Sequence, residues 1–235
     1  MLASKQSAHT YGQWAVSSGT SVIDTIGLIC QYSHMSGNGA TRSRALADSR
    51  RRALLDAALA VFARYGYQKT SMDEVARSAQ LSRQGLYLYF ATKEELFQAA
   101  VRNALENSSR AAVAALTSAS LPLDQRLVRA FDEWLGRYIG IIGGDASDLI
   151  EATSRLSATL LTQYEEVFSD AVTKAIRSSR LLAAYKSSGI TARQITDTLL
   201  ATARGLKHSS QSREQFVRGF AVAVKVLCNP TREHA

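Results

Sequence analysis

The chain has 235 residues, of which 46% are hydrophobic and only 2 are proline, and its formal net charge is +8 at pH 7. This hydrophobic content is enough to build a core, so disorder along the whole length is excluded. The positive charge favours a polyanionic partner, although an anionic membrane or an acidic protein would satisfy it equally well. Helix-favouring residues are common and alternating β-branched runs are scarce, so we expect an all-α fold.

Cysteines and apolar segments argue against secretion and against a membrane span. Cys30 and Cys228 lie far apart and fit neither a disulfide framework nor a paired metal-binding motif. The apolar stretch 22–30 is interrupted by Asp24 and is much shorter than the roughly 20 residues that cross a bilayer. It also lacks the features of a signal peptide. We therefore expect a cytoplasmic protein with no membrane partner, no metal and no cofactor.

Residues 1–44 are rich in Ser, Gly, Thr and Ala and lack sustained periodicity, so we expect a disordered arm or extension. The stretch 20–31 allows a short helix, and either Met1 or Met35 could be the true start. Arginines near the end of this arm either reach the DNA backbone or minor groove, or form a solvated lead-in to the first helix. These residues are Arg42, Arg44, Arg50, Arg51 and Arg52.

Capping signals mark three successive helix starts. Ser71 with Glu74, and Thr92 with Glu95, have the spacing of capping boxes. Between them, Ser82 can cap a third helix of barely two turns. Short helices in this succession indicate a helix-turn-helix unit, and we expect its apolar positions to be core. These positions are Val75, Ala76, Leu81, Leu86 and Phe90.

The amino-terminal end of the short helix carries residue types that read DNA. Arg83 and Gln84 can make paired hydrogen bonds with guanine and adenine edges, and Gly85 lets the backbone come close. The helix end also has partial positive charge and free N–H groups, which favour phosphate. The sequence therefore predicts a sequence-specific DNA-binding protein.

The remaining signals divide the chain into domains. We expect a helix-turn-helix DNA-binding domain over 45–97, an all-α regulatory and dimerisation domain over 98–230, and a tail over 231–235. The first domain opens with a helix over about 49–65, and a long helix over about 93–116 carries the boundary. The later helices are expected at about 123–142, 147–157, 159–179, 192–207 and 212–228.

Residues 50–100 closely resemble the DNA-binding domain of the TetR/AcrR, or tetracycline-repressor, family. A first helix, a YGY turn, TSMDEVA, LSRQGLYLYF and TKEELF follow one another in the family's order and spacing. The later helices agree with the family's regulatory domain in number and length. The resemblance implies a homodimer that binds a palindromic operator and usually represses transcription until a small molecule enters the carboxy-terminal domain.

The same resemblance assigns DNA contacts to particular residues. Thr70, Ser71 and Lys93 correspond to phosphate contacts. Tyr87 and Tyr89 correspond to residues against the backbone beside the groove, although Tyr87 is equally compatible with partial burial. The positions that correspond to the base-reading face are Ser82, Arg83, Gln84 and Gly85. Many relatives carry a larger side chain at the glycine position, so direct readout at one base is reduced here.

Aromatic residues recur at helical spacing in the regulatory part. Ordinary core packing explains such stripes. The alternative is a largely apolar pocket for an unidentified small molecule, which would be lipophilic, or polar if Glu151 and Arg155 face it instead of forming an exposed pair. The candidate pocket residues are Phe131, Trp134, Tyr138, Tyr164 and Phe168.

The last two expected helices carry more apolar surface than terminal elements of a small domain need. We expect this surface to form a four-helix dimer interface. Its residues are Ile195, Leu199, Leu206, Phe216, Phe220 and Val224.

No nucleophile elbow, phosphate-binding loop, zinc-protease motif or dinucleotide-binding glycine motif occurs, so we expect no enzyme. The predicted function is a homodimeric repressor that binds a palindromic operator and is released by a ligand. The alternative is a DNA-binding structural or protein-partner adaptor on the same scaffold, without a small-molecule ligand.

Overall fold

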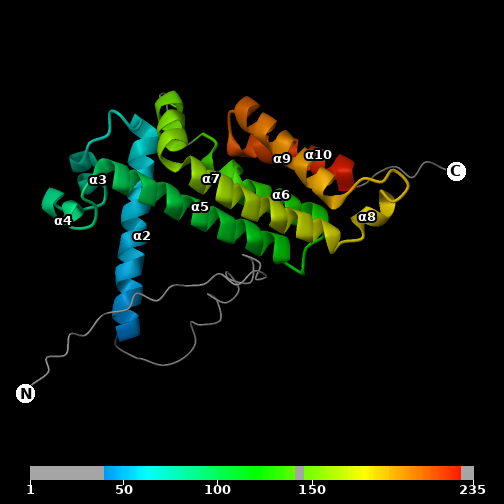
Figure 1. Ribbon diagram of the computed structural model, residues 1–235, viewed down its shortest axis with the longest axis horizontal. Helices are drawn as coiled ribbons and strands as arrows, with labels where there is room; N and C mark the ends of the chain where they lie inside the picture. Colours follow the sequence, from blue (N-terminus) through cyan, green and yellow to red (C-terminus); the bar gives the residue numbers. More distant parts are fainter. Residues whose placement is uncertain (1–39, 141–145, 229–235) are drawn as a thin grey trace, which may run out of the picture. The chain divides into compact units, whose positions relative to one another are not determined.

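The computed structural model describes residues 40–140 and 146–228. These residues form helices joined by short turns and contain no strand, so the expected all-α class is confirmed (Figure 1). The arm over 1–39, with its short helix over 20–31, and the tail over 231–235 lie outside the described residues. None of the described helices combines the length and the hydrophobicity that crossing a bilayer requires.

The elements are α2 (Ala40–Tyr65), α3 (Met72–Ser78), α4 (Arg83–Tyr87), α5 (Lys93–Thr117), α6 (Leu123–Trp134), the 3-10 turn η1 (Gly136–Tyr138), α7 (Ala146–Arg177), α8 (Leu181–Ala184), α9 (Ala192–Ser209) and α10 (Arg213–Cys228). Helix α5 packs against α2, α6 and α7, and α10 packs against α6 and α9. In Figure 1, α5 crosses α2 and then runs alongside α6 and α7.

Helix α2 begins at Ala40, nine residues before the expected start at 49. Residues 40–44, expected in the arm, are therefore helical. The reason lies in the composition of this segment, since Ala and Arg favour helix and no Gly or Pro interrupts it. The other end is as expected, because Gly66 has a φ of 83° and its N–H bonds to the Phe62 carbonyl at 2.9 Å.

Helix α6 is shorter than expected. The prediction of helix over 123–142 is wrong beyond Trp134, where the chain turns through η1. A Cβ at Gly136 would lie 2.4 Å from Asp132 Oδ1 and 3.0 Å from the Phe216 ring, so this turn lets the backbone approach α10 closely. Gly140 then has a φ of 79°, which also ends helical geometry.

Helix α7 covers both helices that were expected over 147–157 and 159–179. It is broken at Ser157, whose φ of −140° and ψ of 16° are non-helical. The expected junction therefore exists as a break within one long element. Helices α9 and α10 lie close to their expected bounds, and α8 was not expected.

The described residues form two apolar cores, and α5 and α7 contribute to both. The first core joins α2, α3, α4 and the first half of α5, and it also takes Leu149 and Ala152 from the beginning of α7. The second joins the end of α5 to α6, α9, α10 and the part of α7 after the break. The part of the chain that follows 98 thus supplies side chains to the core of the part that precedes it.

The candidate pocket aromatics fill the second core instead of surrounding a cavity. Phe131 and Phe168 are fully buried with ring centroids 5.0 Å apart, and Trp134 stacks on Phe168 at 4.9 Å. The Tyr138 hydroxyl hydrogen-bonds to Ser108 Oγ at 2.6 Å and donates to a backbone carbonyl, while Tyr164 packs half-buried at the edge of the core. Rings in mutual contact leave no room for a ligand between them, so the aromatic-walled pocket is absent from this conformation.

The residues assigned to the dimer interface face the chain's own core. Five of them are buried. Leu206 is half-buried and packs against Gly219, because a Cβ added to that glycine would lie 3.0 Å from Leu206 Cδ2. The buried residues are Ile195, Leu199, Phe216, Phe220 and Val224. A side chain enclosed by its own chain cannot meet a partner, so the assignment of these five residues to the interface is corrected, whereas that of Leu206 stays a prediction.

Replacing Phe220 with Ala tests the corrected assignment. The change removes a buried ring that lies 4.4 Å from the Phe131 ring, and we expect unfolding free energy to fall by about 3–5 kcal/mol. Denaturant unfolding measures it, with Ile150→Ala, an exposed site on α7, expected to change stability by no more than about 0.5 kcal/mol. Unchanged stability with a halved mass in solution would instead restore Phe220 to the interface.

Candidate DNA-binding surface

Local capping fixes the three helix starts in the amino-terminal unit, α2 to α4 with the first half of α5. Ser71 and Glu74 form a complete capping box, with the Ser71 N–H donating to Glu74 Oε2 at 2.7 Å. Ser82 Oγ accepts the Gly85 N–H at 3.0 Å and starts α4. The box at α5 is half complete, because the Glu95 carboxylate accepts the N–H of Ala91 instead of that of Thr92.

Helix α4 is held in place by its apolar side. Leu86 and Phe90 are buried in the first core, and Arg51 of α2 lies over the Phe90 ring at 5.4 Å. The preceding turn passes through Gln80, which has a φ of 57°, and the Leu81 N–H bonds to the Ala76 carbonyl at 2.8 Å. Of the expected core residues of this unit, only Leu81 remains half-buried.

The opposite side of α4 faces solvent and carries the expected reading residues. Ser82, Arg83 and Gln84 are exposed, as are Tyr87 and Tyr89. A Cβ at Gly85 would lie 3.1 Å from Ser82 Oγ, so the glycine leaves room for the cap. Sequence reasoning missed one neighbour, Leu88, which is 84% exposed. A single leucine close to the core positions Leu86 and Phe90 gives no sign in the sequence that it is exposed. Its direction depends on where α4 ends, and the helix ends at Tyr87, one residue earlier.

Arg83 is positioned by two neighbours. Its Nε lies 3.2 Å from Asp73 Oδ1, and its guanidinium lies 5.7 Å from the Tyr87 ring centroid. The Tyr87 side chain and the Asp73 carboxylate raise the pKa of Arg83. The pair with Asp73 is exposed and weak, so it can orient the guanidinium without preventing it from exchanging to another acceptor.

Thr70 does not face solvent. It is buried, and its Oγ1 donates to the Gly66 carbonyl at 2.6 Å. The hydroxyl thus closes the turn between α2 and α3, and the expected direct contact of Thr70 with a phosphate is corrected. Ser71, the next residue, is exposed.

Lys93 also supports this turn. Its Nζ donates to the carbonyls of Tyr67 at 3.0 Å, Gln68 at 3.3 Å and Thr70 at 3.2 Å, and it lies 4.5 Å from the Tyr67 ring centroid. An ammonium group has three N–H donors, and all of them are used. The expected hydrogen bond from Lys93 to a phosphate is therefore corrected to a structural role.

The same turn is tied to the beginning of α7. The Gln68 N–H donates to Asp148 Oδ2 at 2.8 Å. Tyr67, beneath it, is buried among the rings of Phe62 and Phe97, and burial together with the Glu94 carboxylate raises the pKa of Tyr67 to about 12. The beginning of α7 is thus hydrogen-bonded directly to the turn that precedes α3.

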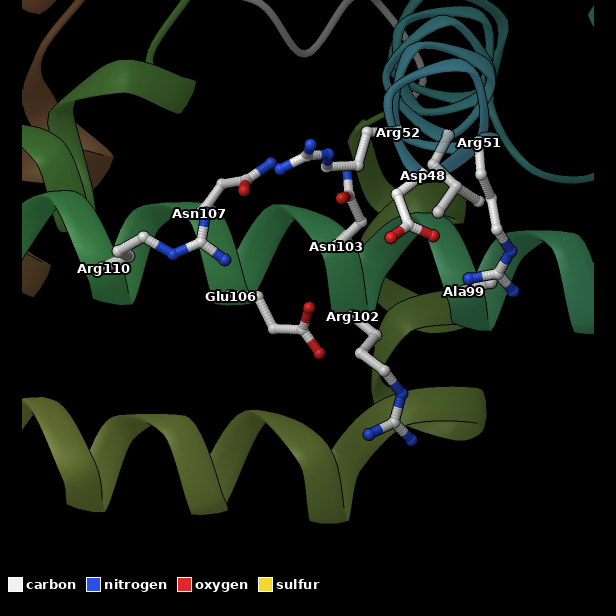
Figure 2. A pocket seen from close by; sticks show the side chains of 10 residues that line it. Asp48, Arg51, Arg52, Ala99, Arg102, Asn103, Glu106, Asn107 and Arg110 are labelled. Atoms are coloured by element: carbon white, nitrogen blue, oxygen red, sulfur yellow. The ribbon is translucent and has the colours of Figure 1, made fainter. Parts of the chain in front are cut away.

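A groove of about 400 Å³ lies between α2 and α5. It is lined by four arginines, two asparagines and two acidic residues as well as apolar ones. Figure 2 shows Arg52 and Arg110 reaching toward Asn107, whereas Arg102 leaves α5 in the other direction, toward the ribbon of α7. Positive charge therefore extends from the amino-terminal unit along α5.

Replacing Lys93 with Met tests its structural role. Three carbonyls would lose their donor, so we expect unfolding free energy to fall by about 1–3 kcal/mol in a urea titration. Lys174→Met on exposed α7 surface is the control, with an expected change of at most about 0.5 kcal/mol. A phosphate contact would give the opposite pattern, with stability unchanged and the slope of log affinity for DNA against log salt reduced by about one.

The residues that build this surface match a known family. The profile of bacterial regulatory proteins of the tetR family matches residues 54–100. The chain is 38% identical over 63 residues to the uncharacterized HTH-type transcriptional regulator YfiR of Bacillus subtilis. This alignment covers 27% of this chain and 31% of that protein. It is 38% identical over 76 residues to the HTH-type transcriptional regulator BetI of Agrobacterium fabrum, in an alignment that covers 32% of this chain and 37% of that protein. The alignments thus span about a third of each relative.

Similarity of structure extends over more of the chain. A crystal structure of a putative transcriptional regulator from Saccharomonospora viridis, in complex with choline, has a TM-score of 0.57 at 19% identity. The superposition covers 76% of this chain and 96% of that one, and at this identity it establishes the fold alone. By the sequence of residues 54–100, the amino-terminal unit of the chain belongs to the TetR family of bacterial regulatory proteins.

Proposed function

We propose that the chain is a homodimeric repressor that binds a palindromic operator through α4 and is released from DNA by a small molecule. One observation carries the DNA-binding part. Burial of Leu86 and Phe90 turns the amino-terminal end of α4 outward, with Arg83 and Gln84 exposed on it. These residue types distinguish base pairs in the major groove, and the helix end suits the phosphates beside it.

The proposed contacts follow from exposure. Arg83 and Gln84 read bases, and Gly85 lets the backbone come close. Ser71 and the tyrosines after α4 contact the sugar-phosphate backbone, where a hydroxyl supplies one directed hydrogen bond. Thr70 and Lys93 hold the turn that presents α3 and do not bind DNA themselves.

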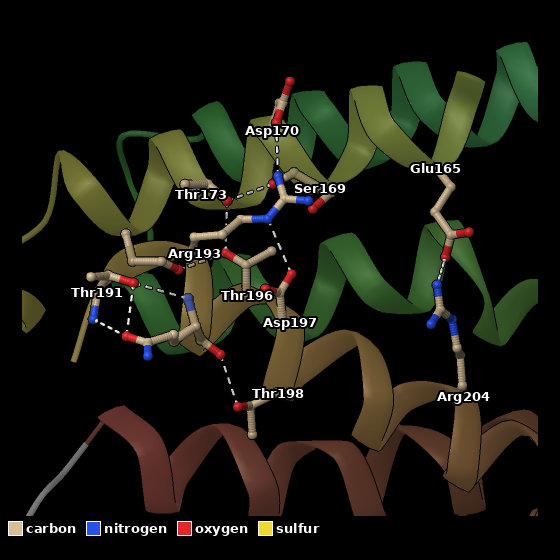
Figure 3. Close-up of polar contacts among 12 residues, drawn as sticks. Glu165, Ser169, Asp170, Thr173, Thr191, Arg193, Thr196, Asp197, Thr198 and Arg204 are labelled. Atoms are coloured by element: carbon tan, nitrogen blue, oxygen red, sulfur yellow. Dashed lines mark hydrogen bonds and ion pairs between the residues drawn. The ribbon is translucent and has the colours of Figure 1, made fainter. Parts of the chain in front are cut away.

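The proposed dimer uses the outer faces of α9 and α10. The inner face of α9 is fixed to α7 by a buried hydrogen bond of 2.9 Å between Thr173 and Thr196, and Arg193 bridges Asp170 and Asp197 at the side (Figure 3). The outer faces carry small or apolar exposed residues. These are Thr198, Ala201 and Gly205 on α9, and Val222 and Val226, 64% and 68% exposed, on α10.

Such faces suit a close helix–helix contact. At Gly205 an added Cβ would meet no atom within 4 Å, so the backbone itself is open to a partner. Two copies of α9 and α10 would form a four-helix bundle, and the two reading helices would then address successive major-groove turns about 34–36 Å apart.

Release by a ligand is supported by the course of α7. Before its break the helix packs in the first core and holds Gln68 through Asp148, and after the break it packs in the second core. A ligand that changes the angle at Ser157 would therefore move the turn before α3. The similar regulator crystallised with choline supports a small-molecule effector of some kind.

The close packing of the aromatic rings favours a second candidate. A core already filled by Phe131, Trp134 and Phe168 is what a DNA-binding adaptor without a ligand would have. The two functions differ in one observable: only the repressor loses operator affinity when a small molecule binds.

Arg83→Ala tests the reading role. We expect a loss of about 1–3 kcal/mol in affinity for the best site, confined to one base pair of each half-site, because a bidentate base contact is removed. Fluorescence anisotropy against duplexes with single base changes measures it. Arg77→Ala removes the same charge from α3, beside α2 rather than α4, and should leave base preference unchanged. An equal loss at every sequence for Arg83→Ala would contradict base reading.

Val222→Arg tests the dimer. A charge placed on a face that is buried in the dimer lacks a partner there, so we expect the mass in solution to fall to that of one chain while the helical circular dichroism signal is kept. Leu46→Arg, the same kind of change on exposed α2, should leave the mass unchanged. A dimer that persists in Val222→Arg would exclude this face.

A further inference from the structure

A groove of about 290 Å³ lies where α7 breaks, against the side of α5. Its floor contains Ser157, the residue with non-helical φ and ψ. This groove shares only Arg102 with the groove between α2 and α5. Its volume suits a small molecule.

Ser157 is the first sign of a ligand. The residue is only 5% exposed, and its Oγ is buried without a hydrogen-bond partner among the described residues. Buried hydroxyl groups almost always have a partner, because leaving one unpaired costs free energy. Ser157 lines the groove, so a bound molecule that displaces the atoms covering Oγ can supply the missing partner.

The charge of the groove gives the chemistry of that molecule. Arg102 of α5 and Arg155 of α7 line it, and none of its described lining residues is acidic. Neither arginine forms an ion pair with another residue in the described ranges. Figure 2 shows Arg102 directed away from the arginines of α2 and toward α7. Arg155 is near enough to Glu94 to help lower the pKa of that carboxyl, but Glu94 does not line the groove. Two guanidinium groups without an ion pair favour an oxyanion, which they can bind through several hydrogen bonds.

Neutral donors complete the lining. Gln98 Nε2 donates to the Leu156 carbonyl at 3.1 Å, which ties α5 to the break and leaves the second N–H of that amide for another acceptor. Thr159 and Gln163 follow on the same side of α7. The described lining thus offers donors around an oxyanion and no carboxylate that would repel it.

We propose that this groove binds a small organic anion, with a carboxylate or phosphate group held between Arg102, Arg155 and Ser157. Its effect on DNA rests on the proposed repressor function, whereas binding itself does not. A cation such as choline, named for the similar structure, would be repelled by this lining. The effector of this chain is therefore of opposite charge.

The position of the groove explains how the anion would act. Arg102 belongs to α5, Arg155 precedes the break in α7, and Ser157 forms it. An anion held by all three fixes the first segment of α7 relative to α5. That segment carries Asp148, which bonds to the turn before α3, so occupancy of the groove is coupled to the presentation of α4.

Calorimetric titration of the full chain tests binding, with citrate as the carboxylate probe and pyrophosphate as the phosphate probe at constant ionic strength. We expect one site per chain, and Arg102→Gln and Arg155→Gln should each weaken it about tenfold or more. Arg110→Gln removes the same charge from α5 outside the groove and should bind as the parent does. The better probe identifies the oxyanion. Binding of neither probe, or equal weakening by Arg110→Gln, would overturn the proposal.

Ser157→Ala separates a ligand contact from a structural role. Removing an unpaired buried hydroxyl should leave the melting temperature of the free chain unchanged or raise it, while anion affinity falls about tenfold. A lower melting temperature with unchanged affinity would show that Ser157 serves the fold alone, and would contradict the proposal.

Operator binding measured with and without the anion separates the two proposals. Loss of DNA affinity that disappears in Arg155→Gln supports both. If the anion binds without changing DNA affinity, the binding site is supported and its regulatory role is contradicted. An absence of specific DNA binding would contradict the proposed function. The calorimetric titration would still show whether the groove binds an anion.

Discussion

Burial of Leu86 and Phe90 is the constraint on which the candidate DNA surface depends. Helix α4 spans only Arg83–Tyr87, too short to be stable alone, so packing must hold it. Once these two side chains enter the first core, the helical repeat turns Arg83 and Gln84 toward solvent. Ser82 caps the exposed end, and the room left by Gly85 keeps that cap in place. The reading residues are therefore displayed by apolar burial on the other side of the helix.

A second constraint is that the two cores share helices. The carbonyls before α3 are held by Lys93 of α5, and the N–H of Gln68 in the same turn is held by Asp148 of α7. Because α5 and α7 both continue into the second core, these two helices connect that core to the turn before α3. The break at Ser157 is the point on α7 where the two packing environments meet.

Capping and turn signals predicted the amino-terminal unit well, because Ser71, Ser82 and Gly66 act within one helical turn of their own positions. Long-range contacts were beyond such reasoning. The Nζ of Lys93 donates hydrogen bonds to backbone carbonyls 23 to 26 positions earlier in the chain, so the sequence around Lys93 does not reveal its structural role. The apolar stripes of α9 and α10 were correctly placed on one face, but a stripe does not reveal whether its own chain or a partner covers it. The end of α6 depended on the approach of Phe216 to Gly136, which is also distant in sequence.

The DNA-reading role of α4 is tested most directly by selecting bound duplexes from a random DNA pool with the full chain at moderate salt. Reading by α4 in a dimer predicts enrichment of one palindrome whose half-sites lie about one helical turn apart, since two copies of α4 related by a twofold axis must read both halves. Retention of duplexes without a common motif, with an affinity that depends on salt alone, would mean that charge and not α4 binds DNA, and would contradict it.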